Sequence, residues 1–277
     1  MLTEFQETQL KEFAANIRSE TIKMISKIGV GHVGGCLSIA DVVACLYGGV
    51  MKIDPKNPKW EERDRFILSK GHAGPAEYAA LALKGYFPME MLDTLNQPPT
   101  NLPSHTDMNR TPGVDMTTGS LGQGISAAVG IALGCRLKGL DNYTYVIVGD
   151  GEAQEGQVWE AAMFAGAKNL NHLIAFVDYN GKQIDGTVEQ VGGKPHFEEK
   201  FAACNWNVLT VEDGNDVAQI WAAIEEAKEE PEKPTAIILQ TVKGKGWKYA
   251  EELENNHNFK VNAEMAAEAC AEFASQI

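Results

Sequence analysis

The apolar positions of the chain follow two rhythms, one typical of helices and one typical of buried strands. Near the N-terminus they recur at steps of three, four or seven residues, at Leu10, Phe13, Ile17, Met24 and Ile28. This spacing predicts an amphipathic helix that ends near Gly29. Residues 38–41 have the form of a capping box and predict the start of a second helix.

Short apolar runs farther along the chain predict strands. These runs cover residues 65–69, 143–148, 173–177, 207–211 and 236–242. Patterns typical of helices lie between them, for example over residues 157–170 and 216–230. Strands that alternate with helices imply an α/β fold with a mostly parallel sheet and helices on both faces. Right-handed crossovers place the C-terminal end of every strand on one edge, where such sheets bind ligands.

The whole chain is expected to form one unit. A length of 277 residues fits one large domain or two small ones, and we expect a single domain over residues 1–277 with a helical tail. The residue pattern of that tail, residues 262–277, predicts a last helix that packs on the domain or on a partner. The lysine- and glycine-containing run at residues 243–246 lacks the spacing of a phosphate loop and is interpreted as structural.

Composition narrows the classes of function. Hydrophobic residues make up 44% of the chain and charged residues 22%, which is typical of ordinary globular proteins. The formal net charge of -14 argues against nucleic-acid and membrane-surface partners, because both favour a basic face. The five cysteines form no CxxC pair, so neither a disulfide framework nor a zinc site is indicated. Neither a signal peptide nor a membrane span is predicted, so we expect a cytoplasmic protein.

Two polar side chains follow neighbouring predicted strands. Asp150 stands between Gly149 and Gly151 after one strand, and Asn180 follows the next. If these strands are adjacent and parallel, a carboxylate and an amide oxygen meet at the sheet edge, which suits Mg²⁺ or Ca²⁺. The glycines let a phosphate approach the backbone, and the helix after Gln154 offers free N–H groups. Each motif alone is a common turn, but together they favour a metal–diphosphate site.

The same motif resembles a known signature. A Gly-Asp-Gly triplet followed by an asparagine, here Asp150 and Asn180, is similar to the thiamine diphosphate motif. Residues 152–156 resemble the transketolase version of it, and the likeness extends from the first helix to about His257. The resemblance implies the thiamine diphosphate-binding fold. It also implies that the backbone carbonyl of Lys182 joins Asp150 and Asn180 in holding Mg²⁺ or Ca²⁺.

The resemblance gives roles to further residues. It places Gly119 and Leu121, in the glycine-rich loop at residues 118–124, against the aminopyrimidine ring of the cofactor, and it packs Ile184 on the cofactor. From the residues alone, this loop is a helix start and not a dinucleotide fingerprint. The resemblance also places Glu155 in a carboxylate network at a subunit interface. Without it, Glu155 is a first-turn residue that complements the helix dipole.

Four of the six histidines lie in loop contexts that match the transketolase family: His32, His72, His105 and His257. From the residues alone each is as well explained by a surface or structural position. The resemblance places His32, His105 and His257 along the substrate channel, where they bind sugar hydroxyls and move protons. It places His72, together with His257, at the diphosphate. The other two histidines are expected to be structural.

Two loops depart from the family pattern. The family usually has Gly-His-Pro where this chain has Ser104, His105 and Thr106, and it has proline where this chain has Val33. Both histidine positions are nevertheless retained, so we expect altered loop shapes and unaltered roles.

The resemblance implies a function that needs a second chain. In the family, a glutamate on a pyrimidine-binding domain generates the nucleophilic carbon of the cofactor. The predicted elements leave no room for that domain before Ile277, so we expect it on a separate C-terminal subunit in a two-fold symmetric heterotetramer. The implied function is that of an N-terminal transketolase subunit, which transfers a two-carbon ketol unit from a ketose to an aldose.

The sequence leaves alternative functions open. The chain also resembles, less closely, deoxyxylulose-phosphate synthases and 2-oxoacid dehydrogenase components, and it could be a non-catalytic regulatory homologue. Residues 69–74 and 152–156 favour transketolase, and the retained Asp150, Asn180 and histidines argue against a regulatory role. The fold does not report the substrate, so pentose phosphates, branched sugars and sulfonated sugars are all compatible.

Overall fold

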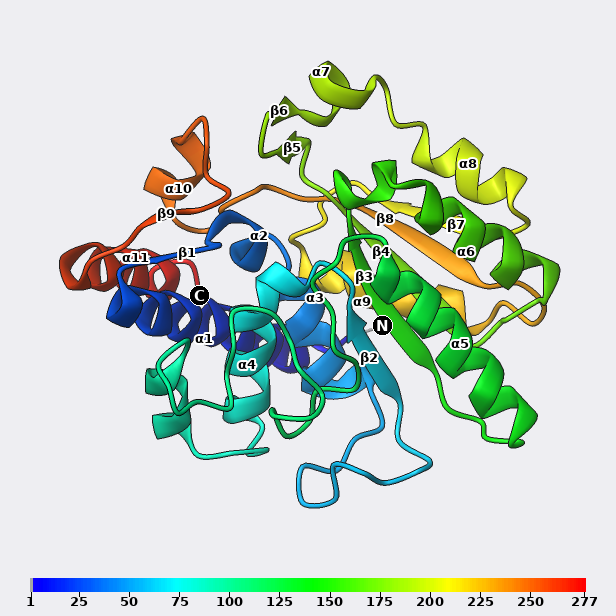
Figure 1. Cartoon of the computed structure of the whole chain (residues 1–277), viewed down its shortest axis with the longest axis horizontal. Helices are drawn as coiled ribbons and strands as arrows, with labels where there is room; N and C mark the ends of the chain where they lie inside the picture. The colour runs from blue at the N-terminus through cyan, green and yellow to red at the C-terminus, as the bar shows by residue number, and fades with distance from the viewer. Residues whose placement is uncertain (1) are drawn as a thin grey trace.

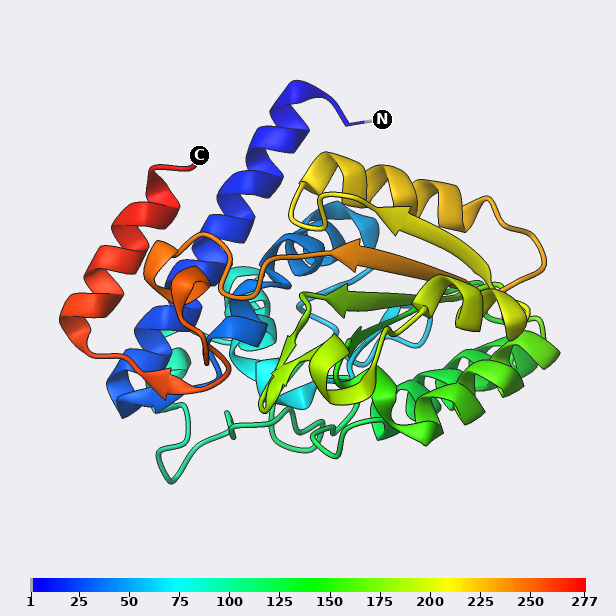
Figure 2. The ribbon, with the colours of Figure 1, turned by 90° about the horizontal axis from the view of Figure 1, so that it is seen from above.

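A five-stranded sheet forms the centre of the computed structural model, which describes residues 2–277 (Figure 1). Across the sheet the strands are β2 (Arg65–Leu68), β3 (Thr144–Gly149), β4 (Leu173–Tyr179), β8 (Thr235–Gln240) and β7 (Asn207–Val211). All neighbouring strands pair in parallel, and their arrows point the same way in Figure 2. The five predicted strands and the α/β fold class are thus confirmed, with strand ends shifted by one or two residues.

Helices cover both faces of this sheet. One face carries α1 (Glu4–Ile28), α3 (Ala40–Cys45), α4 (Gly74–Leu83) and α9 (Val217–Lys228), and the other carries α5 (Gln123–Leu137), α6 (Gly156–Ala167) and α8 (Phe197–Ala203). Alternate strand residues point to opposite faces, so Ile147 packs in the first core and Val146 in the second. The strands are apolar at consecutive positions because both faces of the parallel sheet are buried.

The remaining helices and short strands complete the chain. They are α2 (Gly34–Leu37), η1 (Leu46–Val50), η2 (Gly71–Ala73), η3 (Met89–Thr94), η4 (Glu152–Gln154), α7 (Val188–Gly192), α10 (Lys248–Glu252) and α11 (Ala263–Ala274). Two short antiparallel pairs were not predicted: β1 (Val30–Gly31) with β9 (Phe259–Lys260), and β5 (Lys182–Gln183) with β6 (Gly186–Thr187). The tail helix α11 packs along α1, as the red and blue ribbons show (Figure 2). None of the helices in residues 2–277 combines the length and the apolar character that crossing a membrane requires.

The first helix has the expected boundaries. Thr3 caps α1 at its N-terminus, where its hydroxyl and the side chain of Gln6 form a capping box. The helix ends at Ile28 because Gly29 adopts a left-handed conformation with φ of 82°, which terminates helices readily. The prediction for this segment is confirmed.

The capping box predicted at residues 38–41 is wrong. The helix α3 begins at Ala40 without a side-chain cap, and Ser38 belongs to the end of α2. The Ser38 hydroxyl donates to Asp178 Oδ2 at 2.8 Å, and Asp41 forms a buried ion pair with Arg18. Tertiary partners have therefore taken both side chains that a local cap would need.

Candidate active site

The carboxyl ends of β3 and β4 bring Asp150 and Asn180 to one place on the sheet edge. In the parallel pairing, Gly149 lies opposite Asp178. Asp150 Oδ2 accepts a hydrogen bond from Gly181 N at 2.6 Å, and its Oδ1 accepts one from Gly151 N at 2.7 Å. Burial, together with the nearby Asp178 carboxylate, raises the pKa of Asp150 to about 7. A cation beside Asp150 would therefore relieve an unfavourable buried charge.

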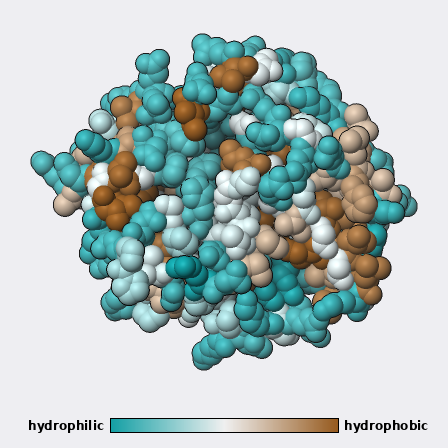
Figure 3. All heavy atoms as spheres, viewed as in Figure 1, coloured by the Kyte–Doolittle hydropathy of each residue, from teal (hydrophilic) through white to brown (hydrophobic). Residues whose placement is uncertain are grey.

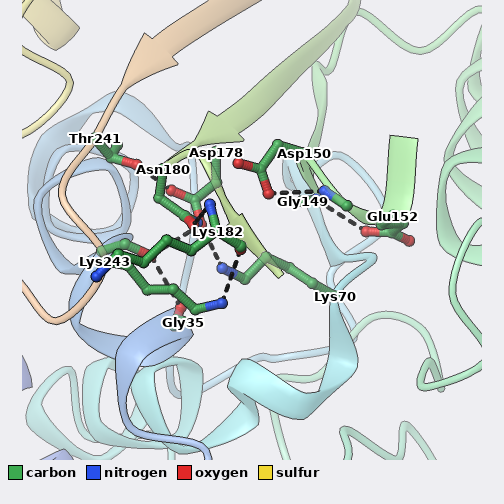
Figure 4. Close-up of polar contacts among 12 residues, drawn as sticks. Gly35, Lys70, Gly149, Asp150, Glu152, Asp178, Asn180, Lys182, Thr241 and Lys243 are labelled. Atoms are coloured by element: carbon green, nitrogen blue, oxygen red, sulfur yellow. Dashed lines mark hydrogen bonds and ion pairs between the residues drawn. The ribbon is translucent and has the colours of Figure 1, made fainter. Parts of the chain in front are cut away.

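Asp178 lies beneath this edge and is fully buried (Figure 4). Its Oδ2 accepts hydrogen bonds from Ser38 Oγ at 2.8 Å, Lys70 Nζ at 2.5 Å and Asn180 Nδ2 at 2.9 Å. Its Oδ1 accepts one from Thr241 Oγ1 at 2.5 Å. Burial opposes ionisation, but the Lys70 charge and these donors hold the pKa of Asp178 below its ordinary value. An ionised Asp178 thus fixes the amide of Asn180.

The side chain of Asn180 is oriented from both ends. Its Nδ2 donates to Asp178, and its Oδ1 accepts from Lys182 N at 3.2 Å. The amide oxygen consequently lies on the side of the loop that carries Lys182. Within residues 2–277 no three His, Cys, Asp or Glu side chains form a metal-binding group. A metal here would therefore rely on Asp150, the Asn180 amide oxygen and the Lys182 carbonyl.

A buried lysine, which the sequence pattern alone had indicated to be structural, reaches the same loop. Lys243 Nζ donates to the Lys182 carbonyl oxygen at 2.9 Å (Figure 4). Lys243 also lines the cavity described below. Burial, with a further contribution from Lys70, lowers the pKa of Lys243 to about 8. The interpretation of residues 243–246 as merely structural overlooked this cation.

Glu152 connects three loops around the site. Its Oε1 accepts from Ser69 Oγ at 2.5 Å and from Gly122 N at 2.8 Å, and its Oε2 accepts from Gly149 N at 3.0 Å. Burial raises the pKa of Glu152. The carboxyl group therefore ties the ends of β2 and β3 to the loop that begins α5, a role that was not predicted although Glu152 begins the motif at residues 152–156.

A cavity of about 390 Å³ opens at this edge, a volume within the range of small-molecule sites. It is lined by ten of the predicted site residues: His72, Leu121, Gly149, Asp150, Gly151, Glu155, Asn180, Lys182, Ile184 and His257. Lys70, Glu152 and Lys243, which were not predicted, also line it. Leu121 and Ile184 remain 39% and 61% exposed, so the cavity has apolar side chains open to further contact.

Glycines allow close packing around the cavity. A Cβ atom on Gly151 would lie 2.9 Å from the side-chain oxygen of Gln183. Gly119 has a φ of 142°, and a Cβ atom there would lie 3.0 Å from the ring of His105. Gly119 therefore needs glycine for its backbone conformation, and at both positions the absence of a side chain lets a neighbouring group approach closely.

The four predicted histidines gather in one group, although they are far apart in sequence. The His32 ring centroid lies 5.3 Å from that of His72, 5.8 Å from that of His105 and 5.2 Å from that of His257. The centroids of His72 and His257 are 4.9 Å apart. This histidine group adjoins the cavity, because two of its members line it.

Burial lowers the pKa of every member of the histidine group. For His257 the pKa falls to about 3, with the Lys243 charge as the second cause. The rings are therefore neutral near pH 7, and each presents one donor and one acceptor nitrogen. The Nδ1 atom of His257 is buried and has no hydrogen-bond partner in the described chain.

The remaining predicted residues lie elsewhere or at the margin. His172 stacks on Tyr143 with centroids 4.5 Å apart, and His196 contacts Glu199, so neither belongs to the histidine group. Glu155 is exposed at the start of α6 and makes no side-chain capping bond. Its expected interface role is not tested within a single chain.

Comparisons with known proteins agree with this geometry. The family model "Transketolase, thiamine diphosphate binding domain" matches residues 9–274. The chain is 55% identical to the 6-deoxy-6-sulfo-D-fructose transketolase subunit SqwG of Clostridium sp. (strain MSTE9), over 98% of each protein. It is 36% identical to one of the subunits of apulose-4-phosphate transketolase from Phocaeicola vulgatus, over 94% of this chain and 92% of the relative.

Solved structures of transketolases are also similar to this chain. Transketolase from Leishmania mexicana superposes with a TM-score of 0.89 and is 34% identical, over 96% of this chain and 41% of the Leishmania chain. The chain thus spans the length of the two relatives named as subunits but less than half of that transketolase. The chain therefore belongs to the transketolase family and corresponds to its thiamine diphosphate-binding domain.

Proposed function

We propose that this chain is the diphosphate-binding subunit of a two-chain transketolase that transfers a two-carbon ketol unit from a ketose to an aldose. The observation that carries the proposal is the single cavity that joins the Asp150–Asn180 edge to the histidine group. When bound, thiamine diphosphate supplies the nucleophilic carbon that takes up the ketol unit. The residues of this chain bind the cofactor and handle protons at the sugar.

The oxygen donors at the sheet edge fit a hard divalent cation. Asp150 offers a carboxylate, Asn180 an amide oxygen and Lys182 a backbone carbonyl, which is the ligand chemistry that Mg²⁺ and Ca²⁺ prefer. Gly149 and Gly151 expose backbone to the cavity, so a diphosphate can approach it closely. We therefore assign the metal and the diphosphate to this edge.

Cationic and neutral nitrogen groups extend the diphosphate site. His72 and His257 line the cavity next to Lys70 and Lys243. Two ammonium groups and two imidazole donors suit a ligand with several phosphate oxygens. These donors, together with the divalent cation assigned to the sheet edge, give an acidic chain the groups that a polyanion requires.

Three of the four histidines, including His257, suit proton transfer at a sugar. His32, His105 and His257 are neutral near pH 7, so they can both donate to and accept from hydroxyl and carbonyl oxygens. Gly119 lies against His105, and Leu121 and Ile184 provide apolar surface at the cavity. We assign these last three residues to the aminopyrimidine ring and the adjoining part of the cofactor.

An apolar surface supports the need for a partner. The helices α5 and α6 begin at the cavity, and in their later turns, away from it, they expose Leu137, Met163 and Phe164 by 79%, 55% and 44%. Figure 3 shows hydrophobic atoms gathered on the side where Figure 1 places these helices. Exposed apolar surface of this kind marks interaction sites. We propose that a C-terminal pyrimidine-binding subunit covers the cavity, with Glu155 at the interface, in a two-fold symmetric heterotetramer.

The relatives suggest the class of donor. One is named for 6-deoxy-6-sulfo-D-fructose and the other for apulose-4-phosphate, and both names describe sugars with an anionic group. The higher identity, 55% against 36%, favours a sulfonated ketose as the donor of this enzyme. A phosphorylated ketose is the alternative that the assay compares.

Reconstitution tests the proposal. The purified chain receives thiamine diphosphate, Mg²⁺, an aldose acceptor and either 6-deoxy-6-sulfo-D-fructose or fructose 6-phosphate, with and without the pyrimidine-binding subunit. We expect no turnover by the chain alone and restored turnover on mixing, because assembly completes the site. Turnover without a partner contradicts the two-chain architecture. Failure of the mixture with both donors contradicts the assigned activity.

A further inference from the structure

Lys243 is a buried cation without an anionic partner in the described chain. The residue is only 5% exposed, and no carboxylate of residues 2–277 lies within 4.0 Å of its ammonium. Lys70, which lines the same cavity, is instead paired with Asp178 at 2.5 Å. The Asp150 and Asp178 carboxylates act on the Lys243 ammonium only from beyond 4.0 Å, so this buried charge is not held in an ion pair and can take an anion from outside the chain.

The Lys243 ammonium currently uses the carbonyl that the metal also needs. Its Nζ donates to the Lys182 carbonyl oxygen at 2.9 Å. That carbonyl is the candidate third metal ligand beside Asp150 and Asn180. An ammonium and a divalent cation on the same oxygen repel each other strongly in a buried site.

The base of the Lys243 side chain is fixed, and only its end is free to change partner. A Cβ atom on Gly34 would lie 2.9 Å from Lys243 Cγ, so the lysine stem packs directly over the glycine backbone. The Lys243 carbonyl accepts from Asn256 Nδ2 at 2.9 Å, and Gly244 N donates to Gly34 O at 3.1 Å. A change of partner therefore requires rotation of the terminal bonds and no movement of the backbone.

We propose that Lys243 is an exchangeable internal cation, which holds the Lys182 carbonyl until the metal binds and then pairs with the diphosphate. This inference rests on the proposed function. The exchange makes Lys243 a positioning residue that links two binding events: it opposes the metal when no cofactor is present and favours the cofactor once the metal is bound. A purely structural lysine would not act in opposite directions on the two affinities.

The test compares charge-removing variants of two nearby lysines. Lys243→Met removes the proposed exchangeable cation. The matched control is Lys245→Met, which removes the same charge two positions away from a partly buried lysine outside the cavity. Asp150→Ala identifies the metal site. Where Lys243→Met does not fold, Lys243→Gln, which removes the charge but keeps a polar end, is measured in its place.

Mn²⁺ binding to the full chain is measured by electron paramagnetic resonance, first without and then with thiamine diphosphate. We expect Lys243→Met to bind Mn²⁺ at least about fivefold more tightly than wild type without the cofactor, since a coupling of this size is typical of linked sites. With Mn²⁺ saturating, its affinity for thiamine diphosphate should fall about 10- to 100-fold, because a charge-assisted hydrogen bond is lost. Lys245→Met should match wild type in both titrations.

Mn²⁺ affinity of Lys243→Met that is equal to or weaker than that of wild type overturns the exchange. An unchanged affinity for thiamine diphosphate overturns it as well. These outcomes leave the proposed function intact, provided that wild type binds and Asp150→Ala does not. If wild type binds no Mn²⁺ even with thiamine diphosphate, both the exchange and the proposed function fail.

Discussion

Two buried carboxyl groups in different regions of the molecule differ in their hydrogen-bond partners and in the direction of their pKa shifts. Asp178, at the end of β4, is 0% exposed, and Glu77, inside α4, is 1% exposed. Asp178 accepts hydrogen bonds from four side chains, whereas the Oε2 atom of Glu77 has no partner in residues 2–277. The pKa of Asp178 lies below its ordinary value, and burial, with Asp115 as the second cause, raises the pKa of Glu77 well above its own.

This difference separates groups that hold a site from groups that are merely enclosed. Asp178 gathers Lys70, Ser38, Thr241 and Asn180 under the cavity, so its burial organises the chemistry above it. Glu77 packs among the helices on one face of the sheet and is not among the residues that line the cavity. A buried charged residue is therefore informative about function only together with its partners.

His105, unlike the two buried carboxyl groups, is expected to affect turnover and not stability. His105→Ala should lower turnover of the assembled enzyme by about 100- to 10,000-fold, the usual contribution of a general acid–base group. Because His105 is only partly buried and carries no charge near pH 7, stability should change by less than about 1 kcal/mol. Steady-state kinetics measures the change in turnover, and thermal unfolding measures the change in stability. A turnover loss below about fivefold with every donor contradicts the role.

Substitution of Asp178 tests whether the hydrogen bonds around this carboxylate stabilise the fold. Asp178→Asn keeps the shape of the side chain but leaves Lys70 buried without a counter-ion, and it replaces one acceptor oxygen by a donor group. We expect the free energy of unfolding to fall by about 3–5 kcal/mol, as for other broken buried pairs. Urea unfolding measures it, with Asp141→Asn as the matched control, since the Asp141 side chain is 98% exposed. A loss below about 1 kcal/mol would show that the network does not hold the fold.

Substitution of Glu77 is expected to raise stability where substitution of Asp178 lowers it, and by a smaller amount. The pKa of Glu77 is raised in the folded state, so the stability it contributes is present below its ordinary pKa of 4.5 and is lost as pH rises toward the folded value. Glu77→Gln should therefore increase the free energy of unfolding at pH 7 by about 1–2 kcal/mol, and the gain should vanish near pH 4.5. Urea unfolding from pH 4.5 to 8 measures it, with the exposed Glu160→Gln as control. Parallel pH profiles of wild type and Glu77→Gln would contradict the account.

The fold could largely be predicted from sequence because periodicity reports buried faces. The five sheet strands and the helices α1, α6, α9 and α11 follow directly from apolar spacing. The two-residue strands could not be predicted, since residues such as Val30 and Lys182 pair through backbone contacts that leave no side-chain pattern. The capping box at residues 38–41 failed because Ser38 binds Asp178, which lies 140 positions away.

The candidate site was predicted only in part, because contacts between distant segments leave no local pattern in the sequence. Asp150 and Asn180 were recognisable because they stand at strand ends beside glycine, and family resemblance pointed to the histidines. The roles of Glu152 and Lys243 were missed because the contacts that define them, from Ser69 and Gly122 to Glu152 and from Lys243 to Lys182, join distant segments. Asp178 could have been found, since it is the one charged residue in the apolar strand β4 and must therefore have partners.

We propose that Asp150 holds thiamine diphosphate through a divalent metal at the edge of the sheet. Isothermal titration calorimetry of wild type and Asp150→Ala with thiamine diphosphate, at millimolar Mg²⁺ and after chelation, tests it most directly. We predict that wild type binds only with Mg²⁺ and that Asp150→Ala loses at least about 100-fold in affinity while its thermal unfolding remains cooperative, because an oxygen ligand of the metal is gone. Equal affinities of the two proteins, or binding that is indifferent to Mg²⁺, would contradict the account.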